Sequence, residues 1–434
     1  MCERMNASHQ RKGMSYGIKR RTAECFGTHE IRTECLFARR CRYGETEVIN
    51  AFIETNPEGI VRLAPTGLAA RNLKSGGMTI HRFLKMLERN QQVSPERTRS
   101  YLEGVSHLII EEISMVRSDL LARLDRVLQF CLKRKAPFGG IPIVVVGDFY
   151  QLPPVVKTQK EYEFLIKHLY GIFAFNAPVW SKADFLNVEL KTSHRQTDGD
   201  FLRLLRSVRL GTEELDALLP WLNSRVKLFP HSEARYLCCY RSRAEHINQC
   251  FVESVLSPEH FFTGKCDGNY PEEDWPVPIS LRVKMGMFVL LTANEAHGDY
   301  VNGDLGIVIA WELDYICVNL LRGPLVMVAR NTWLNYEYSI GITPSGDPRL
   351  NARIIGSFTQ FPILPAYAMT IHKAQGQTLD RVHLDLPARP CFASGQLYTA
   401  LSRVRKLEDL SLSRPIRRSD VNVSEHVRCF YERI

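Results

Sequence analysis

The stretches "VSHLIIEEISMV", residues 105 to 116, and "IPIVVVGDFYQLPPV", residues 141 to 155, decide the fold. Each is a short apolar run that ends in polar side chains. Runs of this kind are typical of strands buried on both faces, as in a parallel sheet covered by helices. Helical patterns at residues 46–56 and 79–90 accompany these runs. We therefore predict an α/β fold with parallel sheets and flanking helices.

Polar side chains follow these runs at the point where each strand should end. In parallel sheets the chemistry gathers at the carboxyl ends of the strands, and here those ends carry Glu111, Glu112, Asp148 and Gln151. One carboxylate at such an end can hold the Mg²⁺ of a nucleoside triphosphate, and its neighbour can orient the attacking water. The alternatives are that the two glutamates cap the next helix and that Gln151 makes ordinary loop hydrogen bonds.

Composition sets broad limits on the kind of protein. The 434 residues leave room for two or three domains, and 45% hydrophobic with 24% charged residues is ordinary for a globular chain. No apolar run reaches the roughly 18 residues of a membrane span, and the first thirty residues lack a secretory signal pattern. We expect an intracellular protein, cytoplasmic if its source is bacterial. The twelve cysteines form no CxxC pair, so we interpret them as reduced thiols.

The formal charge of +9 suits a nucleic-acid partner, but its distribution weakens that inference. Residues 1–46 alone contain ten Lys or Arg and five Asp or Glu. More than half of the excess therefore lies in a segment that differs from the rest, with no Val, Asp or Pro and four of the twelve cysteines. Charge by itself does not identify a partner.

Seven stretches carry a resemblance to a known family. They are "LAPTGLAA" (63–70), "TIHRFL" (79–84), "LIIEEISMV" (108–116), "GDFYQLPPV" (147–155), "HRQTDGDFLRLLRSVRLG" (194–211), "AYAMTIHKAQGQTLD" (366–380) and "YTALSRVRKLEDL" (398–410). They occur in the order found in Pif-type DNA helicases of superfamily 1, the RecD-like group. The resemblance covers residues 46–434. It implies two RecA-like P-loop NTPase domains that clamp ATP and move 5′-to-3′ along single-stranded DNA.

The resemblance also implies roles for individual residues. Glu112 resembles the residue that polarises the attacking water, and Glu111 occupies the Mg²⁺-binding place where the family usually has Asp. Gln151 resembles the phosphate sensor. Arg195 and Arg403 match two arginines that reach the terminal phosphate, the alternative for each being a surface ion pair. The remaining nucleotide contacts that it implies are Gly44, Thr46, Gln375 and Gly376, with Thr46 and Glu111 as metal ligands.

A polar cluster in "LPAYAMTIHKAQG" predicts DNA contacts. Thr370, His372 and Lys373 follow an apolar strand and suit the phosphates of a strand held without reading its bases. The alternative is a helix cap at Thr370 with a solvated Lys373. Tyr367 and Phe149 could stack on bases or belong to the core. The resemblance adds contacts at Pro65, Thr66 and His81. It further implies forked or structured DNA as substrate, no membrane, a monomer, and roles in DNA repair, recombination or replication.

The chain should divide into two RecA-like domains and one insertion. We predict residues 46–195 as the first domain, and 196–275 with 350–434 as the second. Residues 276–349 contain short β-rich runs separated by turns such as Asn302-Gly303, which favour a small SH3-like β-barrel. Residues 1–45 form an anomalous head.

The head lacks the expected phosphate-binding loop. A P-loop reads GxxxxGK[ST] between a strand and a helix, and it cradles phosphates with backbone N–H groups and a lysine. In "ARRCRYGETEVINAF", residues 38 to 52, the helix should begin near Thr46, and Glu45 stands at the lysine position. A carboxylate facing a triphosphate is repelled by it.

A shift of the reading frame by one base accounts for this segment. Suitable codons for residues 39–45, read one base later, give Gly-Asp-Ala-Gly-Thr-Gly-Lys, a complete P-loop. Cys41 then allows only Ala or Val, and Glu45 only Lys or Arg. We infer that the head is out of frame, by mutation or sequencing error, so that the chain as written binds ATP poorly. The alternative is a non-catalytic pseudo-helicase that binds single-stranded DNA.

Overall fold

The computed structural model describes most of the chain from Leu36 onward. The described ranges are 36–39, 45–55, 58–73, 77–156, 158–189, 196, 198–228, 234–295, 299–300, 302–321, 323–342, 348–389 and 393–434. Within these ranges no helix is both long enough and apolar enough to cross a membrane.

A first parallel sheet has the strand order β3-β2-β4-β5-β1-β6. Its strands are β1 (Leu36–Arg39), β2 (Ile60–Ala64), β3 (Met78–Thr79), β4 (His107–Ile110), β5 (Ile143–Val146) and β6 (Leu186–Glu189). Successive strand residues point to opposite faces. Ile109 packs with Ile49 and Phe52 of α2 (Glu45–Thr55), whereas Leu108 and Ile110 belong to the cluster with α4 (Ile80–Val93) and α6 (Ser118–Leu132). Helices therefore cover both faces, as the apolar runs predicted.

Further helices belong to the chain between the strands of the first sheet. They are α3 (Gly67–Asn72), α5 (Pro95–Glu103), α7 (Gln159–Leu169) and α8 (Pro178–Ala183). The 3₁₀ turn η1 (Ile113–Met115) follows β4 directly. Since α2 begins at Glu45, the helix expected near Thr46 is present.

A second parallel sheet has the order β18-β7-β19-β20. Its strands are β7 (Arg235–Cys238), β18 (Ala368–Thr370), β19 (Val382–Asp385) and β20 (Leu410–Leu412). On one face Leu237 packs with Phe201 of α9 (Gly199–Leu210), and on the other Cys238 packs with Ile247 of α11 (Arg241–Ser254). The remaining helices are α10 (Leu215–Asn223), α12 (Ile371–Ala374), α13 (Gln396–Leu401) and α14 (Glu425–Glu432).

The chain between α11 and β18 forms antiparallel strands. Their bounds are β8 (Glu259–Thr263), β9 (Lys265–Gly268), β10 (Ser280–Lys284), β11 (Phe288–Leu291), β12 (Leu305–Trp311), β13 (Tyr315–Leu320), β14 (Leu325–Ala329), β15 (Asn331–Ile342), β16 (Pro348–Gln360) and β17 (Ile363–Pro365). Five of them form the sheet β14-β13-β12-β11-β17, and β15 pairs with β16 as a long hairpin. These strands extend on both sides of the predicted range 276–349, and the division into domains stays a prediction.

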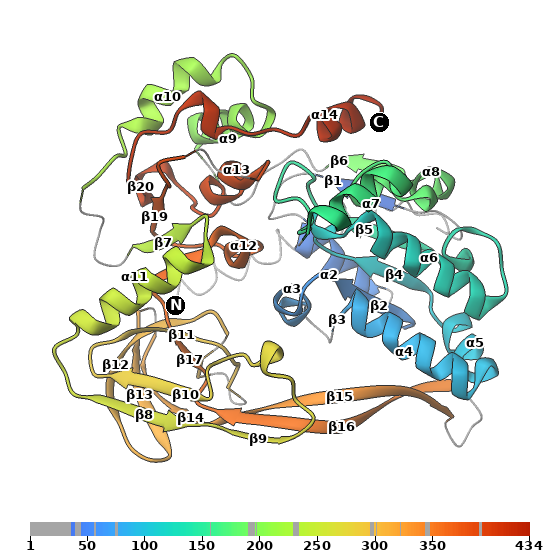
Figure 1. The fold of residues 1–434 in the computed structure, drawn as a ribbon, viewed down its shortest axis with the longest axis horizontal. Coiled ribbons are helices and arrows are strands. Elements are labelled where there is room, and N and C mark those ends of the chain that lie inside the picture. Colours follow the sequence, from blue (N-terminus) through green and yellow to red (C-terminus); the bar gives the residue numbers. More distant parts are fainter. Residues whose placement is uncertain are drawn as a thin grey trace, which may run out of the picture.

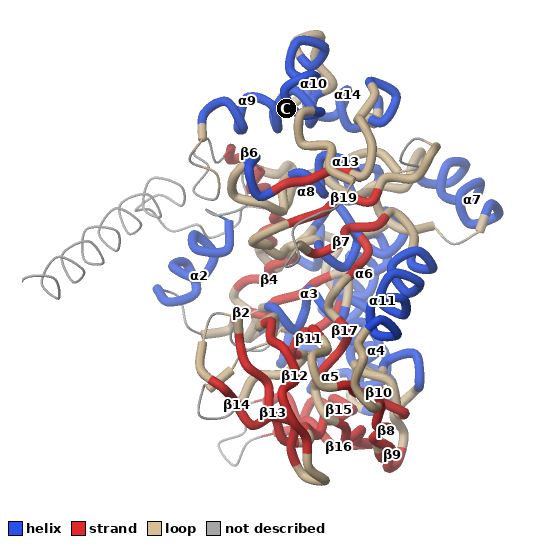
Figure 2. The backbone as a smooth tube through the Cα atoms, turned by 90° about the vertical axis from the view of Figure 1, so that its left-hand side faces the viewer, coloured by secondary structure: helices blue, strands red, loops and turns tan. Residues whose placement is uncertain are grey.

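The sheets surround a common centre (Figures 1 and 2). The first sheet lies on the right of Figure 1, the second on the upper left, and the antiparallel strands below them. The hairpin β15–β16 reaches back to α4, where Arg82 Nη2 donates to the Tyr336 carbonyl oxygen over 2.8 Å. The helix α14 returns to the first part, and its Val427 is buried in that core. Segments distant in sequence thus meet on two sides of the molecule.

Candidate functional site

The turn after β4 separates two adjacent carboxylates. Glu111 continues the sheet, since its backbone N–H donates to the Leu63 carbonyl oxygen over 2.9 Å. Glu112 then adopts φ 53° and ψ 46°, a left-handed conformation that is uncommon for a residue with a Cβ atom. Such conformations cluster at functional sites. The turn directs the two side chains to different partners.

Glu111 binds an arginine of the neighbouring strand. Its Oε1 lies 2.5 Å from Arg62 Nη2 and 3.2 Å from Arg62 Nε, and only 9% of Glu111 and 5% of Arg62 are exposed. Burial raises the pKa of Glu111, and the Arg62 guanidinium opposes that shift. The predicted metal ligand is therefore already paired within the protein.

Glu112 meets the second half of the chain. Its Oε2 accepts a hydrogen bond of 2.7 Å from Gln375 Nε2, and Gln375 also lies 3.4 Å from Ser114 Oγ. A Cβ atom at Gly376, whose φ is +81°, would lie 3.3 Å from Glu112 Oε1. The structure thus brings together the predicted water-polarising residue and two predicted nucleotide contacts. The Oε1 atom of Gln375 is buried and accepts no hydrogen bond from the described residues.

Arg403 is fully buried and supports the same turn. Its Nη1 donates to the carbonyl oxygens of Ala374, at 2.9 Å, and Gln377, at 3.1 Å, while its Nε donates to Thr399 at 2.7 Å. The alternative of a surface ion pair is wrong, because the guanidinium is inside the protein and contacts backbone oxygens. In this structure Arg403 therefore fixes the backbone on both sides of Gln375.

Gln151 lies where the two halves touch. Only 4% of it is exposed, and its backbone N–H donates to the Asp148 carbonyl oxygen over 2.9 Å. Gly395, at φ +69°, packs so closely that a Cβ atom there would overlap the carbonyl oxygens of Tyr150 and Gln151. The loop after β5 is therefore fixed against the start of α13.

Asp148 forms a buried ion pair with an arginine from the second half of the chain. Arg209 of α9 donates to both of its oxygens, at 3.0 and 2.9 Å, and the Tyr398 hydroxyl lies 3.3 Å away. The guanidinium also lies 4.2 Å from the centre of the Tyr150 ring. Burial alone would lower the pKa of Arg209, but the Asp148 carboxylate raises it above the usual value. This pair joins β5 to the second half of the chain.

A groove of about 1290 Å³ carries part of the predicted DNA contacts. Thr370 and Lys373 line it from the second sheet, together with Arg241 and Gly67. Thr370 Oγ1 accepts from the Lys373 backbone N–H over 3.2 Å, so the predicted helix cap is present. Burial lowers the pKa of Lys373, and Arg241 lowers it further. Both alternatives for Thr370 remain compatible, since its cap leaves it on the wall of the groove.

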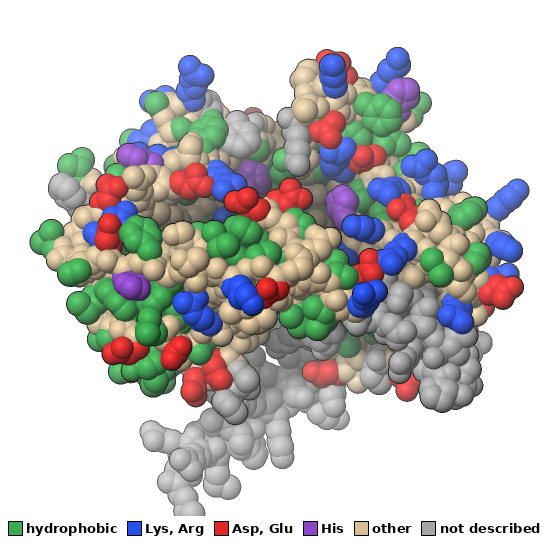
Figure 3. Space-filling view, turned by 60° about the horizontal axis from the view of Figure 1, so that its bottom comes forward, with side chains coloured by type: hydrophobic (Ala, Val, Ile, Leu, Met, Phe, Trp, Pro, Cys, Tyr) green, Lys and Arg blue, Asp and Glu red, His purple; other side chains and the backbone are tan. Residues whose placement is uncertain are grey.

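The groove is not uniformly basic. Its walls also include six acidic residues, which are Glu245, Glu272, Glu273, Asp274, Asp304 and Asp380. On the face drawn in Figure 3 basic and acidic side chains are likewise interspersed. A ligand with negative charge would therefore contact selected positions such as Lys373 and Arg241, rather than a continuous positive surface.

Of the predicted first-domain DNA contacts, Pro65 and Thr66 lie next to the groove. Thr66 caps α3, accepting from the Ala69 backbone N–H over 3.1 Å, and it adjoins Gly67 on the groove wall. Pro65 is partly exposed just before it, at the end of β2. His81 is exposed at the start of α4, and burial followed by Arg123 lowers its pKa. His372 is partly buried in α12, and burial lowers its pKa.

Some predicted residues fall outside the described part of the chain. They are Gly44 and Arg195, and the side chain of Thr46, whose backbone lies in α2. The neighbour of Arg195 is described: Gln196 Nε2 donates to the Val404 carbonyl oxygen over 3.0 Å. This bond holds the segment after Arg195 next to Arg403.

Phe149 belongs to the core, whereas Tyr367 is partly buried and packs against a core cluster. Phe149 is 1% exposed among other aromatic rings, and the Tyr367 ring stacks on Phe251 with 4.8 Å between centroids. The sequence analysis missed two functional candidates, Arg62 and Arg209. The signal for Arg62 was a charged residue within the apolar run "GIVRLAPTG".

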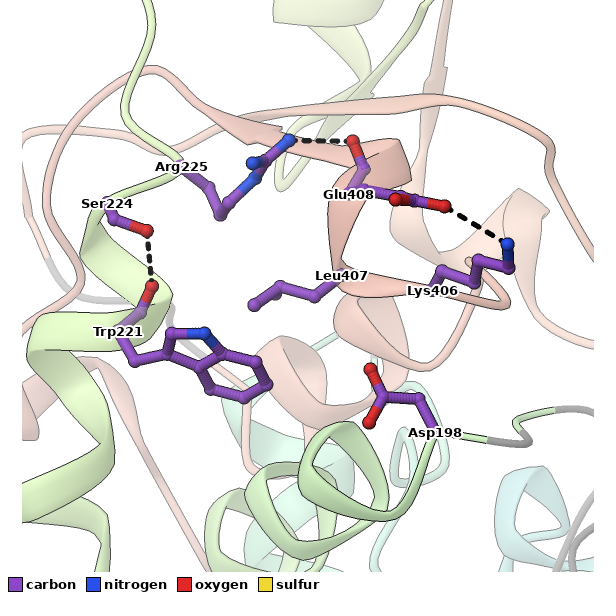
Figure 4. Close-up of a pocket in the computed structure, with 7 residues that line it drawn as sticks. All are labelled: Asp198, Trp221, Ser224, Arg225, Lys406, Leu407 and Glu408. Carbon is purple, nitrogen blue, oxygen red and sulfur yellow. Dashed lines mark hydrogen bonds and ion pairs between the residues drawn. The ribbon is translucent and has the colours of Figure 1, made fainter.

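A second cavity, of about 470 Å³, contains none of the predicted residues (Figure 4). Its lining residues are Asp198, Trp221, Ser224, Arg225, Lys406, Leu407 and Glu408. Arg225 donates to the Glu408 carbonyl oxygen over 2.7 Å. Among the described residues no cluster of three or more His, Cys, Asp or Glu could hold a metal, and seven cysteines there are free thiols.

Comparison with known proteins gives consistent matches. The sequence model described as PIF1-like helicase matches residues 46–216. The ATP-dependent DNA helicase Pif1 of Campylobacter jejuni is 30% identical over 383 residues, which are 81% of this chain and 81% of that protein. The ATP-dependent DNA helicase PIF1 of Danio rerio is 31% identical over 396 residues, 87% of this chain. The chain spans only 58% of that relative's length.

Solved structures of Pif1 from Bacteroides resemble the whole described fold. The complex with ADP-AlF4 has a TM-score of 0.78 at 29% identity, and covers 96% of both chains. The complex with single-stranded DNA has a TM-score of 0.70 at 30% identity, again over 96% of both. A structure that concerns DNA unwinding at forked double-stranded DNA has a TM-score of 0.69 at 30% identity, and covers 96% of both chains. Parallel sheets with flanking helices are shared, which confirms the predicted fold class.

Proposed function

The chain belongs to the PIF1-like helicase family, and from this membership we propose that it is an ATP-dependent DNA helicase acting on single-stranded DNA. The observation that carries the proposal is the Gln375–Glu112 hydrogen bond at the ends of two parallel sheets. It links Glu112, which would polarise water, to the turn at Gln375. Gln377, two residues further on, lines the groove together with Lys373. Nucleotide chemistry and DNA contact then share one short segment.

The chemical steps follow from the side chains around that bond. Glu112 would accept the proton of the attacking water, because a carboxylate held by an amide stays in place while its other oxygen is available. Gln151 and Arg403 would respond to the terminal phosphate, as predicted. For Arg403 this requires exchange of backbone oxygens for phosphate oxygens, so the turn of Gln375 would move with the nucleotide. Arg195 would add a second positive charge from the same side.

Mg²⁺ accompanies ATP in such sites, and Thr46 and Glu111 were its predicted ligands. The side chain of Thr46 lies outside the described residues, and the carboxylate of Glu111 is bound to Arg62. Glu111 therefore does not fit a metal ligand. Mg²⁺ would then be held by the phosphates of ATP, and Glu112, Gln151, Arg195 and Arg403 would act through their own side chains without a metal.

The DNA would lie in the groove between the sheets and the antiparallel strands. Lys373 and Thr370 line it with Arg241, and such groups bind phosphates without reading bases. The Bacteroides relative has been solved bound to single-stranded DNA, and another similar structure concerns DNA unwinding at forked double-stranded DNA by two coordinating Pif1 helicases. We propose single-stranded and forked or structured DNA as substrates, 5′-to-3′ movement, a monomeric state, an intracellular location, and roles in DNA repair, recombination or replication. The predicted domain limits belong to the same proposal.

The head of the chain qualifies the proposal. Residues 40–44 lie outside the described part, and Glu45 begins α2 in the place of a P-loop lysine. We propose that the head is out of frame and that the written chain is impaired in ATP binding. The second candidate is a non-catalytic protein that binds single-stranded DNA, favoured by Glu45. Sequencing the gene across codons 1–50 decides between a damaged and a genuinely divergent head.

One set of assays tests the function. The written chain is assayed for ATP binding by calorimetry, and for unwinding of forked duplexes that carry either a 5′ or a 3′ single-stranded tail. Unwinding that requires ATP and the 5′ tail supports the helicase. Tight DNA binding with no ATP binding supports the non-catalytic candidate if replacing residues 39–45 by Gly-Asp-Ala-Gly-Thr-Gly-Lys does not restore ATP binding. Absence of both DNA binding and ATP binding in a folded chain contradicts both.

A further inference from the structure

Arg62 is a charged residue in a strand that should be apolar. It is the third residue of β2, in "IVRLA", and pairs in register with Ile109 of β4. Both faces of the first sheet are covered by helices, and strands in such sheets are normally apolar on each side. Ile109 packs against Phe52 of α2, and Arg62 Nη1 lies 3.5 Å from Asn50 Oδ1 of the same helix. A buried arginine here needs a specific partner.

Its partner is the carboxylate predicted to hold Mg²⁺. Two nitrogens of Arg62 lie 2.5 and 3.2 Å from Glu111 Oε1, and the exposed fractions of the two side chains are 4% and 12%. Charge-assisted contacts of this kind are about twice as strong as neutral hydrogen bonds. Neighbouring strands lie about 4.8 Å apart, a gap that the longer side chain of Glu bridges more easily than Asp. The glutamate and the arginine therefore match each other.

A divalent cation at Glu111 would meet two obstacles. It would be repelled by the guanidinium beside the carboxylate, and that repulsion is weakly screened in a buried place. Displacing Arg62 would break both of its charge-assisted contacts with Glu111 in a buried place, which is strongly unfavourable. The pair is thus a closed arrangement in which the guanidinium occupies the position of a cation.

We propose that Arg62 takes the place of a divalent cation at Glu111, so that the carboxylate positions β4 against β2 and α2 and does not ligate metal. Arg62 is a positioning residue: it fixes the strand end from which Glu112 emerges. The ion pair is independent of the proposed function. The proposal that Glu111 does not ligate the metal of a nucleotide rests on the proposed function. The experiments below test the ion pair and the metal separately.

The pair is tested by a double-mutant cycle in urea, with Arg62→Met, Glu111→Gln and the double variant. In EDTA each single change should raise the unfolding equilibrium constant, and the double variant should unfold on the order of tenfold less readily than the product of the single effects requires. The exposed pair Arg123–Glu88, at 2.6 Å, serves as the matched control and should show little coupling. Additive effects of Arg62 and Glu111 would overturn the proposal.

The metal statement is tested by repeating the cycle with Mg²⁺ or Mn²⁺ at about 10 mM. If Arg62 holds Glu111 against the cation, the coupling is unchanged. Coupling that disappears with the cation would show that the metal takes Glu111 from Arg62, and would overturn the proposal. If a single variant does not fold, Arg62→Lys replaces Arg62→Met. A lysine has one side-chain nitrogen, so it loses one of the two Arg62 contacts with Glu111, and hydrogen exchange at the β2–β4 amides of the folded protein reports that loss.

Nucleotide binding gives an independent reading. The Kd for ADP is measured in Mn²⁺ and in EDTA for the wild-type chain and for Glu111→Gln. The ratio of the two values should differ less than about twofold between the proteins. A ratio that falls tenfold in Glu111→Gln would assign the metal to Glu111 and overturn the proposal. Where the written chain binds no ADP, as its impaired head implies, the same ratio is measured in the chain with residues 39–45 repaired, and the urea cycles decide the role of Arg62 in either case.

Discussion

Gln375 Nε2 donates to Glu112 Oε2 over 2.7 Å, a hydrogen bond between residues 263 positions apart. Glu112 follows a strand of the first parallel sheet, and Gln375 follows the short helix after β18 of the second. Arg403 fixes the Gln375 turn through the carbonyl oxygens of Ala374 and Gln377. The carboxylate proposed for catalysis is thus held by the half of the chain that would move along DNA.

Replacing Glu112 by Gln should remove hydrolysis and keep the fold. An amide oxygen at this position still accepts from Gln375, but it cannot take a proton from water. Loss of a general base costs about 10²- to 10⁴-fold in rate. The measurement is DNA-stimulated phosphate release by the chain with a repaired P-loop, together with thermal unfolding. An unchanged rate in Glu112→Gln would assign the base to another residue.

Repair of residues 39–45 should restore nucleotide binding. Replacement by Gly-Asp-Ala-Gly-Thr-Gly-Lys supplies backbone N–H groups for the phosphates and exchanges the negative Glu45 for a lysine. We expect weak ATP binding in the written chain and DNA-dependent hydrolysis in the repaired one, read by calorimetry and phosphate release. If the upstream strand shares the altered frame, full repair extends to re-reading from about residue 25. Strong hydrolysis by the written chain would show that these residues already form a phosphate site.

The sequence predicted the parallel sheets because their strands are continuous apolar runs, and it placed Glu111 and Glu112 at a strand end. It did not predict the partners of these residues. Arg62 and Glu111 are 49 positions apart, and Asp148 and Arg209 are 61 apart. Such pairs depend on the register of β2 against β4 and on the docking of α9, which local patterns do not contain.

The Arg62 contact also reverses one expectation from the sequence. Because the family usually has Asp at this place, the resemblance implies that Glu111→Asp should improve a metal site. Since Glu111 instead reaches Arg62, the shorter side chain should lose part of that contact. We now expect Glu111→Asp to unfold at a lower urea concentration than the wild type. Arg403 also differs from its expectation. The resemblance implied a contact with a phosphate, whereas in the folded chain the guanidinium donates to backbone carbonyl oxygens.

Replacing Lys373 by Ala should weaken binding to single-stranded DNA of any sequence. The side chain lines the groove and would contact a phosphate, so its loss should lower the magnitude of the slope of log K against log salt by about 0.7. Fluorescence anisotropy with two unrelated oligonucleotides at several salt concentrations measures this. Lys182→Ala, an exposed lysine on α8, is the control. A loss confined to one oligonucleotide would indicate base reading instead.

Stability should fall as the pH drops from about 7.5 to 5.5. Burial lowers the pKa of His107, His372 and His383 from 6.5, with Asp385 opposing the shift at His383. Between the folded and unfolded pKa values the unfolded chain binds more protons, so stability is complete above about 6.5 and decreases below it. Urea midpoints across this range test the sign. His383→Gln should reduce the dependence, and the exposed His168→Gln should not.

Breaking the Asp148–Arg209 pair should destabilise the contact between the two halves of the chain. Its side chains are 1% and 8% exposed, and both oxygens of Asp148 accept from Arg209. Removal of one partner leaves a buried charge, so Arg209→Met should destabilise the fold by about 3–5 kcal/mol. Arg203→Met is the matched control, because Arg203 lies on the same helix and pairs with Glu214 at the surface, where ion pairs contribute little. Urea unfolding compares the two, and equal effects would show that the buried pair does not join the halves.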